Sequence, residues 1–125
     1  MPKPRKSLKK PRSLAFVVQK GSCYYCGQPM WNADPLALIS KYSISHRQAK
    51  LLQCTGEHLV AHKDGGSCLP ENIVAVCHFC NSHRHGNRKK EILPAQYREL
   101  VQKRLVKGGW HGLNLVDATL SATVI

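Results

Sequence analysis

Apolar residues in the first half of the chain follow the spacing of short helices. Asp34 stands before Pro35, which is the order of an N-cap residue and a proline in the first helical position, and residues 36–39 supply an apolar side. A second short helix is expected to begin at Ser45, because apolar residues recur behind it. The apolar stretch 13–20 is too short to assign to a helix or a strand.

Beyond residue 55 the pattern changes to short β-like runs. Residues 58–61 and 73–76 indicate two strands, and the turn-rich segment 63–72 joins them. Helices are predicted from about 80 to 90 and from 94 to 107, where two glycines stop the second one. Helices around a short pair of strands predict an α+β fold.

The size of the chain limits how it can be stabilised. With 125 residues, 42% of them hydrophobic, it has room for one domain with a modest core. Six cysteines can add cross-links, either as disulfides or as metal-bound thiolates. We find neither a secretory signal nor an apolar stretch of membrane-spanning length, and therefore expect a cytoplasmic protein without a membrane partner. A reducing compartment favours metal over disulfides.

Basic residues dominate the charge. Nineteen Lys and Arg against seven Asp and Glu give a formal charge of +12, whereas a charge of roughly 2 to 8 suffices to keep a small domain soluble. A cluster between prolines near the N-terminus predicts a flexible arm over 1–20 that binds phosphate without reading sequence. A second group of basic residues lies on the predicted helix over 80–90, and the alternative for that group is a solvated helix face. The residues expected to bind nucleic acid are Lys3, Arg5, Lys6, Lys9, Lys10, Arg12, Arg84, Arg88, Lys89 and Lys90.

Four cysteines form two pairs with the same internal spacing, Cys23-x-x-Cys26 and Cys77-x-x-Cys80. Each pair can place two thiolates on one side of a tetrahedral zinc ion, and the two pairs together make one closed structural site. Such a site contributes about 10 to 16 kcal/mol of binding free energy that is coupled to folding. The alternative is a pair of disulfides or unrelated buried thiols. The remaining two cysteines, at 54 and 68, are expected to be ordinary free thiols.

The order of polar residues between and after the cysteine pairs resembles the HNH endonucleases. In that family a ββα-metal motif carries an acidic residue followed by His on a first strand, Asn at the start of a second, and Asn or His at the head of a helix. Here the corresponding residues are Glu57, His58, Asn72 and Asn81, with a pair of glycines and the second cysteine pair in the expected places. The resemblance covers residues 21–111. The chain departs from it at Glu57, where many members have Asp.

The chemistry of these residue types agrees with phosphodiester hydrolysis. The imidazole of His58 can accept a proton from water near neutral pH. Oxygen atoms of Glu57 and Asn81 suit Mg²⁺ or Mn²⁺. His83 or His85 can add a nitrogen ligand, and His85 is the better candidate because it lies four residues after Asn81 on one helix face. A nitrogen ligand would also tolerate Ni²⁺ or Zn²⁺.

The resemblance implies a particular architecture and activity. It implies a small zinc-stapled ββα-metal core with accessory helices over 21–111, followed by a tail over 112–125 of unknown role. It also implies a metal-dependent endonuclease that cuts duplex DNA to leave a 3′-hydroxyl and a 5′-phosphate. Asn72 would hold the loop and orient the ring of His58 rather than bind metal. The sequence leaves the oligomeric state open, a dimer included.

Other interpretations stay open from the sequence alone. A zinc-ribbon module that binds DNA without cutting it fits the cysteines and the charge, and so does an RNA-binding or structural adaptor. His58 can be a half-buried strand residue, Asn72 a turn residue and Asn81 a helix cap. Neighbouring strand residues point to opposite faces, so Glu57 and His58 meet at one phosphate only if the strand starts or bulges there.

Overall fold

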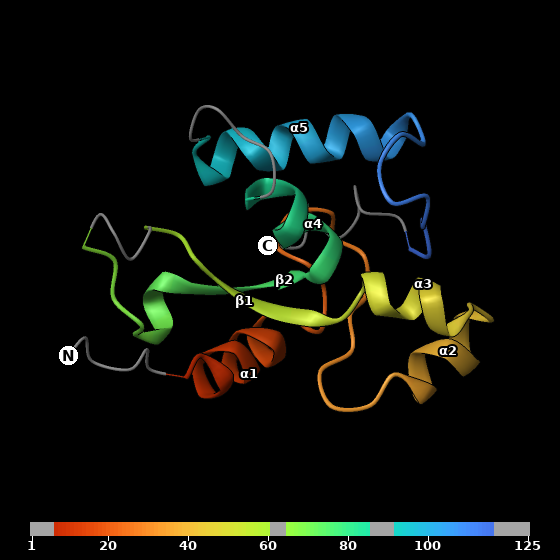
Figure 1. The fold of residues 1–125 in the computed structure, drawn as a ribbon, viewed down its shortest axis with the longest axis horizontal. Coiled ribbons are helices and arrows are strands. Elements are labelled where there is room, and N and C mark those ends of the chain that lie inside the picture. Colours follow the sequence, from red (N-terminus) through yellow and green to blue (C-terminus); the bar gives the residue numbers. More distant parts are fainter. Residues whose placement is uncertain (1–6, 61–64, 86–91, 117–125) are drawn as a thin grey trace.

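The computed structural model describes residues 7–60, 65–85 and 92–116. Within them five helices surround a two-stranded antiparallel sheet, which confirms the α+β class (Figure 1). None of the helices in these ranges is long and apolar enough to cross a membrane. In chain order the elements are α1 (Lys9–Val18), α2 (Leu36–Tyr42), α3 (His46–Leu51), β1 (Cys54–His58), a short 3-10 helix (Pro70–Asn72), β2 (Ile73–Cys77), α4 (His78–His85) and α5 (Pro94–Val106).

The sheet lies between two helices. Strand β1 pairs with β2 over its whole length, with Cys54 opposite Cys77 and His58 opposite Ile73. Helix α1 covers one face, helix α4 covers the other, and α5 lies outside α4 (Figure 1). Gly56 faces α1 so closely that a Cβ there would lie 3.4 Å from the Cβ of Arg12. The residues on either side of Gly56 therefore point toward α4.

The helices with clear start signals form where the sequence predicts them. Asp34 accepts a hydrogen bond from the backbone N–H of Leu36 at the start of α2. At α3, Ser45 and Gln48 form a reciprocal capping box, in which each side chain accepts from the backbone of the other. Helix α5 begins at Pro94, also as predicted. These signals are local, so they do not depend on the tertiary fold.

The first strand is displaced from its predicted position. The sequence analysis places it at 58–61, but β1 is Cys54–His58 and ends where the prediction begins. The stretch Thr55-Gly56-Glu57 lacks the apolar alternation of a strand because it has a polar residue toward α4 and a glycine toward α1. The second strand and the start of the following helix lie within three residues of their predictions.

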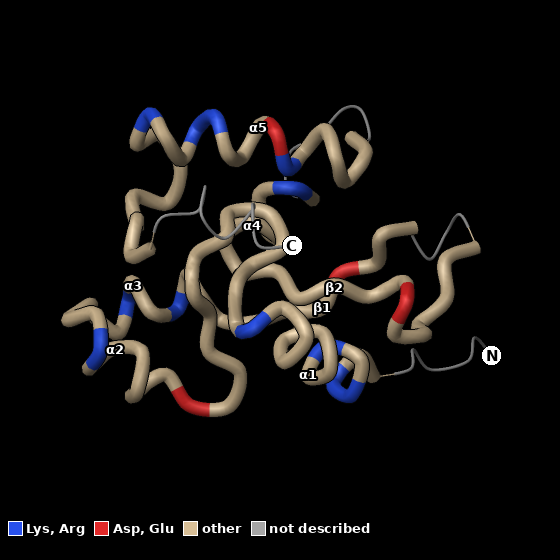
Figure 2. Tube along the Cα trace, turned by 180° about the vertical axis from the view of Figure 1, so that it is seen from behind, with Lys and Arg blue, Asp and Glu red and all other residues tan. Residues whose placement is uncertain are grey.

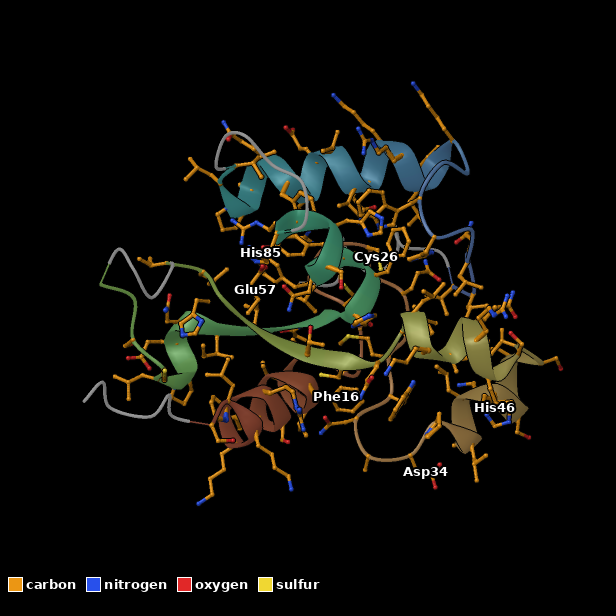
Figure 3. The ribbon with its side chains drawn as sticks, viewed as in Figure 1. Phe16, Cys26, Asp34, His46, Glu57 and His85 are labelled. Atoms are coloured by element: carbon orange, nitrogen blue, oxygen red, sulfur yellow. The ribbon has the colours of Figure 1, made fainter. Side chains whose placement is uncertain are left out.

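Helix α1 corrects the prediction of a flexible arm over 1–20. Residues 9–18 are helical, and Phe16 packs against the core beneath the sheet (Figure 3). After the helix, the side-chain amide of Gln19 bonds both the N–H and the C=O of Ala75 in β2, at 2.9 and 2.8 Å. The side-chain amide of Gln19 thus makes the two hydrogen bonds that the backbone of a neighbouring strand would make with the outer edge of β2. Residues 1–6, which include Lys3, Arg5 and Lys6, lie outside the described ranges.

Replacing Gln19 by Leu tests whether α1 belongs to the folded domain. The change leaves the buried N–H of Ala75 without a partner, and we expect the free energy of unfolding to fall by about 2 kcal/mol. Urea denaturation monitored by circular dichroism measures it. Val17→Ala is the control, since Val17 is 71% exposed and should change stability by no more than about 0.5 kcal/mol. Equal stability of Gln19→Leu and wild type would mean that α1 is not anchored through this residue.

Candidate functional site

Four buried cysteines come together as the spacing predicts. The sulfur atoms of Cys23, Cys26, Cys77 and Cys80 all lie within 4.8 Å of one another, and they are positioned to bind a metal ion. A tetrahedral ion with bonds of about 2.3 Å separates its sulfur ligands by about 3.8 Å. The distance between the sulfurs of Cys26 and Cys77 is 3.9 Å. The four cysteines are therefore positioned to bind one metal ion, as expected, and none of them is paired in a disulfide.

Hydrogen-bond donors surround the cluster. The backbone N–H groups of Tyr25 and Cys77 point at the sulfur of Cys23, at 3.4 and 3.3 Å. The indole N–H of Trp110 donates to the sulfur of Cys80 at 3.2 Å. A ring nitrogen of His111 lies 3.5 Å from the sulfur of Cys26. Donors of this kind stabilise thiolates.

The thiols also affect one another's acidity. Burial raises the pKa of Cys77 and of Cys80 well above the ordinary value. Burial also acts to raise the pKa of Cys23, but hydrogen bonds from the other three thiols outweigh it and hold that pKa well below the ordinary value. The cluster by itself thus favours one thiolate at the expense of its neighbours. A divalent cation removes this competition, because it stabilises all four thiolates together.

Trp110 and His111, for which the sequence suggests no role, both lie beside this cluster. The ring of Trp110 packs edge-on against Phe79 at 5.0 Å, and Phe79 also contacts His111. Burial lowers the pKa of His111, which favours its neutral ring. They follow the two glycines after α5, a position that gives no signal in sequence because the contact depends on how α5 folds back over α4.

A second polar group lies between β1 and α4 (Figure 3). Glu57 is only 4% exposed, and one of its oxygens, Oε1, contacts two side-chain nitrogens. Nε2 of His85 lies 2.6 Å away and Nη1 of Arg84 lies 3.0 Å away. The other oxygen, Oε2, is buried and has no hydrogen-bond partner within the described ranges. Burial and then the Glu57 carboxylate raise the pKa of the nearby Tyr25, so this phenol stays protonated.

Asn81 shares the side of the sheet on which Glu57 lies. Its amide N–H donates to the hydroxyl of Thr55 at 2.9 Å. Thr55 and Glu57 are two residues apart on β1, and Asn81 and His85 are four apart on α4, so strand and helix run alongside each other with matching steps. The structure therefore brings Glu57, Asn81 and His85 onto one side of the sheet. His83, the other candidate ligand, instead stacks on Phe79 at 3.8 Å between ring centroids.

His58 leaves the strand on the opposite side. It is the last residue of β1, two residues after Gly56, and so shares the face toward α1 rather than the face of Glu57. Its Nε2 lies 3.6 Å from the sulfur of Cys68 in the connection between the strands. The structure does not bring His58 onto the side that Glu57, Asn81 and His85 share. His62, in the segment after His58, lies outside the described residues.

Asn72 holds this connection together. Its side-chain oxygen accepts from the N–H of Val60, and its amide donates to the C=O groups of Val60 and Ser67, at 2.8 to 3.1 Å. Both ends of the segment after β1 are thus tied to the residue that precedes β2. These bonds fit the role of holding the loop.

Arg84 is a correction to the predicted nucleic-acid contacts. It is 7% exposed and paired with Glu57, so it is not available to bind phosphate. The reason is its place on α4, where it faces β1 and α5 rather than solvent. Of the other basic residues named above, Lys9 and Lys10 are exposed, and they and Arg12 lie on α1, across the sheet from α4 (Figure 2). Arg88, Lys89 and Lys90 lie outside the described ranges.

Fold and site together define a small α+β protein with four cysteines positioned to bind a metal ion and a buried Glu57–Arg84 ion pair that the exposed His85 joins. Comparisons with protein-family models, with curated proteins and with solved structures found no match.

Cys77→Ser tests the metal site. The variant loses one of four sulfur ligands at the junction of β2 and α4, and we expect it to lose both bound zinc and cooperative folding, because metal binding and folding are coupled. Metal analysis after gel filtration and thermal melting measure the two effects. Cys54→Ala is the control, since Cys54 is a buried thiol outside the cluster whose pKa burial raises to about 11. An unchanged melting curve and zinc content for Cys77→Ser would contradict the assignment.

A double-mutant cycle on Glu57 and Arg84 measures their coupling. Arg84→Met leaves the buried carboxylate without its cation, and we expect a loss of about 3 to 5 kcal/mol in the free energy of unfolding. Glu57→Gln together with Arg84→Met should cost less than the sum of the single changes, since neither charge is then left alone. Additive losses in chemical denaturation would show that the pair contributes no coupling energy.

Proposed function

We propose that this chain is a metal-dependent nuclease of the HNH type that hydrolyses phosphodiester bonds of DNA. The observation that supports the proposal is the contact of His85 with Glu57, together with the bond of Asn81 to Thr55, which places Asn81 on the same side of the sheet. Zinc in the four-cysteine cluster would serve the fold, because four thiolates and no open position are typical of structural sites.

The residues present fit a divalent cation. A carboxylate oxygen, an amide oxygen and an imidazole nitrogen form a mixed donor set that suits Mn²⁺ and, through its oxygens, Mg²⁺. The buried Oε2 of Glu57, for which the described part of the chain offers no hydrogen-bond partner, is an oxygen that such a cation would satisfy. When bound, the cation would stabilise charge on the phosphate and on the departing oxygen.

The remaining steps belong to side chains. His58 would take the proton from the attacking water, and general-base catalysis of this kind contributes roughly 10²- to 10⁴-fold. Because the ring contacts Cys68 on the far side of β1, this role requires the ring to turn around the end of the strand toward the phosphate. Asn72 bonds to Val60 and Ser67 and would thereby keep the backbone next to His58 and Cys68 in place while the ring moves.

The charge of the chain favours nucleic acid as the partner. A formal charge of +12 attracts a phosphate backbone and makes binding salt-dependent. Exposed basic side chains lie on α1 and α5, on two sides of the molecule (Figure 2). We infer that DNA phosphates contact these helices without base-specific readout.

One observation favours a second candidate, a DNA-binding module that does not cut. Arg84 already compensates the charge of Glu57, and a carboxylate with its own cation has less need of a metal. This candidate predicts salt-sensitive binding with zinc retained and no cleavage in Mg²⁺ or Mn²⁺.

Nicking of supercoiled plasmid tests the proposal. We expect wild type to convert plasmid to open circles in Mg²⁺ or Mn²⁺ and to be inactive in chelator. His58→Ala should be slower by about 10²- to 10⁴-fold while remaining folded. His46→Ala is the matched control, because His46 is exposed on α3, away from Glu57 and His85 (Figure 3), and it should nick like wild type. Equal nicking by folded His58→Ala would overturn the role of His58, and no nicking by wild type would favour the binding module.

A further inference from the structure

Arg84 is fixed by more partners than a surface arginine. Its Nη1 lies 3.0 Å from Oε1 of Glu57, and its Nη2 donates to the backbone C=O of Ile92 at 2.7 Å. The guanidinium also lies 5.8 Å from the ring centroids of both Tyr25 and Tyr97. Tyr25 comes from the first cysteine pair and Tyr97 from α5. The position of Arg84 is therefore set by separate parts of the chain.

The two nitrogens that reach Glu57 approach the same oxygen. Oε1 contacts both Arg84 and His85, while Oε2 is buried and has no hydrogen-bond partner among the residues that the structure describes. Because the two oxygens of a carboxylate are rigidly linked, contacts that fix Oε1 also limit the direction in which Oε2 points. If His85 binds a cation with Nε2, it must leave Oε1, and among the described residues Arg84 is then the remaining ionic contact of that oxygen.

We propose that Arg84 is a positioning residue that holds Oε1 of Glu57 so that Oε2 is presented to the catalytic cation. The inference rests on the proposed function. Arg84 was predicted from the sequence to bind nucleic acid, and this role replaces that one. Glu57 is then a ligand that is already oriented before the cation binds.

The charge of Arg84 distinguishes this role from simple support of the fold. A guanidinium on one oxygen repels a cation on the other, so it lowers cation affinity while it improves the orientation of the ligand. Removing the charge should therefore affect affinity and rate in opposite directions. A residue needed only for folding would lower both in proportion to the fraction of unfolded protein.

The test uses Arg84→Met and Arg84→Lys in the full chain loaded with zinc. We expect Arg84→Met to bind Mn²⁺ as tightly as wild type or more tightly in calorimetry, and to nick plasmid with kcat lowered about 10- to 100-fold per folded molecule. Arg84→Lys keeps the charge but cannot reach both Glu57 and Ile92, so its Mn²⁺ affinity should stay at the wild-type level with kcat lowered less. Arg47→Met, at an exposed arginine of α3, is the matched control and should bind Mn²⁺ like wild type.

Two results would overturn the role of Arg84. One is a wild-type kcat per folded molecule in both variants, and the other is loss of Mn²⁺ binding in Arg84→Met as large as in Glu57→Gln. Should Arg84→Met fail to fold, Arg84→Lys decides by its kcat alone. Failure of the proposed function looks different: wild type then neither nicks nor binds Mn²⁺ in a way that Glu57→Gln abolishes, and Arg84 serves the fold only.

Discussion

Four sulfur atoms from two distant parts of the chain meet in the core and determine where the neighbouring elements lie. Their cluster joins the turn that carries Cys23 and Cys26 to the junction of β2 and α4, which are about fifty residues away in sequence. A zinc ion bound there would contribute as much free energy as the whole stability of a small domain with a modest core. Because Cys80 lies in the first turn of α4, the link fixes where that helix crosses the sheet. The positions of Asn81, Arg84 and His85 follow from it.

The buried Glu57 group depends on this placement. Burying a carboxylate and a guanidinium costs free energy unless each finds partners. Here the partners come from α4, from the first cysteine turn and from the segment before α5. An apolar contact would serve stability alone at least as well in a protein of this size. The retention of a charged group at this position is what links the geometry to the proposed chemistry.

Local signals predicted more of the fold than composition did. Caps and prolines located α2, α3 and α5, and repeated spacing located the metal site, since both depend on neighbours in sequence. Strand β1 was displaced because its polar and glycine residues serve α4 and α1. Helix α1 was not predicted because its sequence is basic and contains a proline. The contact of Gln19 with β2, which holds the helix in place, joins residues far apart in the chain and therefore has no local signal. The spacing of four residues between Asn81 and His85 predicted that His85 would share a helix face with Asn81, and His85 does contact Glu57 on that side of the sheet. The burial of Arg84 could not be predicted, because a charged residue is expected at the surface.

In the proposed function, the four-cysteine cluster positions a separate cation site between β1 and α4. A crystal of the zinc-loaded protein soaked in Mn²⁺, with anomalous scattering recorded at the absorption edges of both metals, would show whether that site exists. We expect zinc among the four sulfurs and manganese bound by Glu57, Asn81 and His85, with Arg84 still on the carboxylate. Crystals that bind manganese elsewhere but not at Glu57 would rule out this second site.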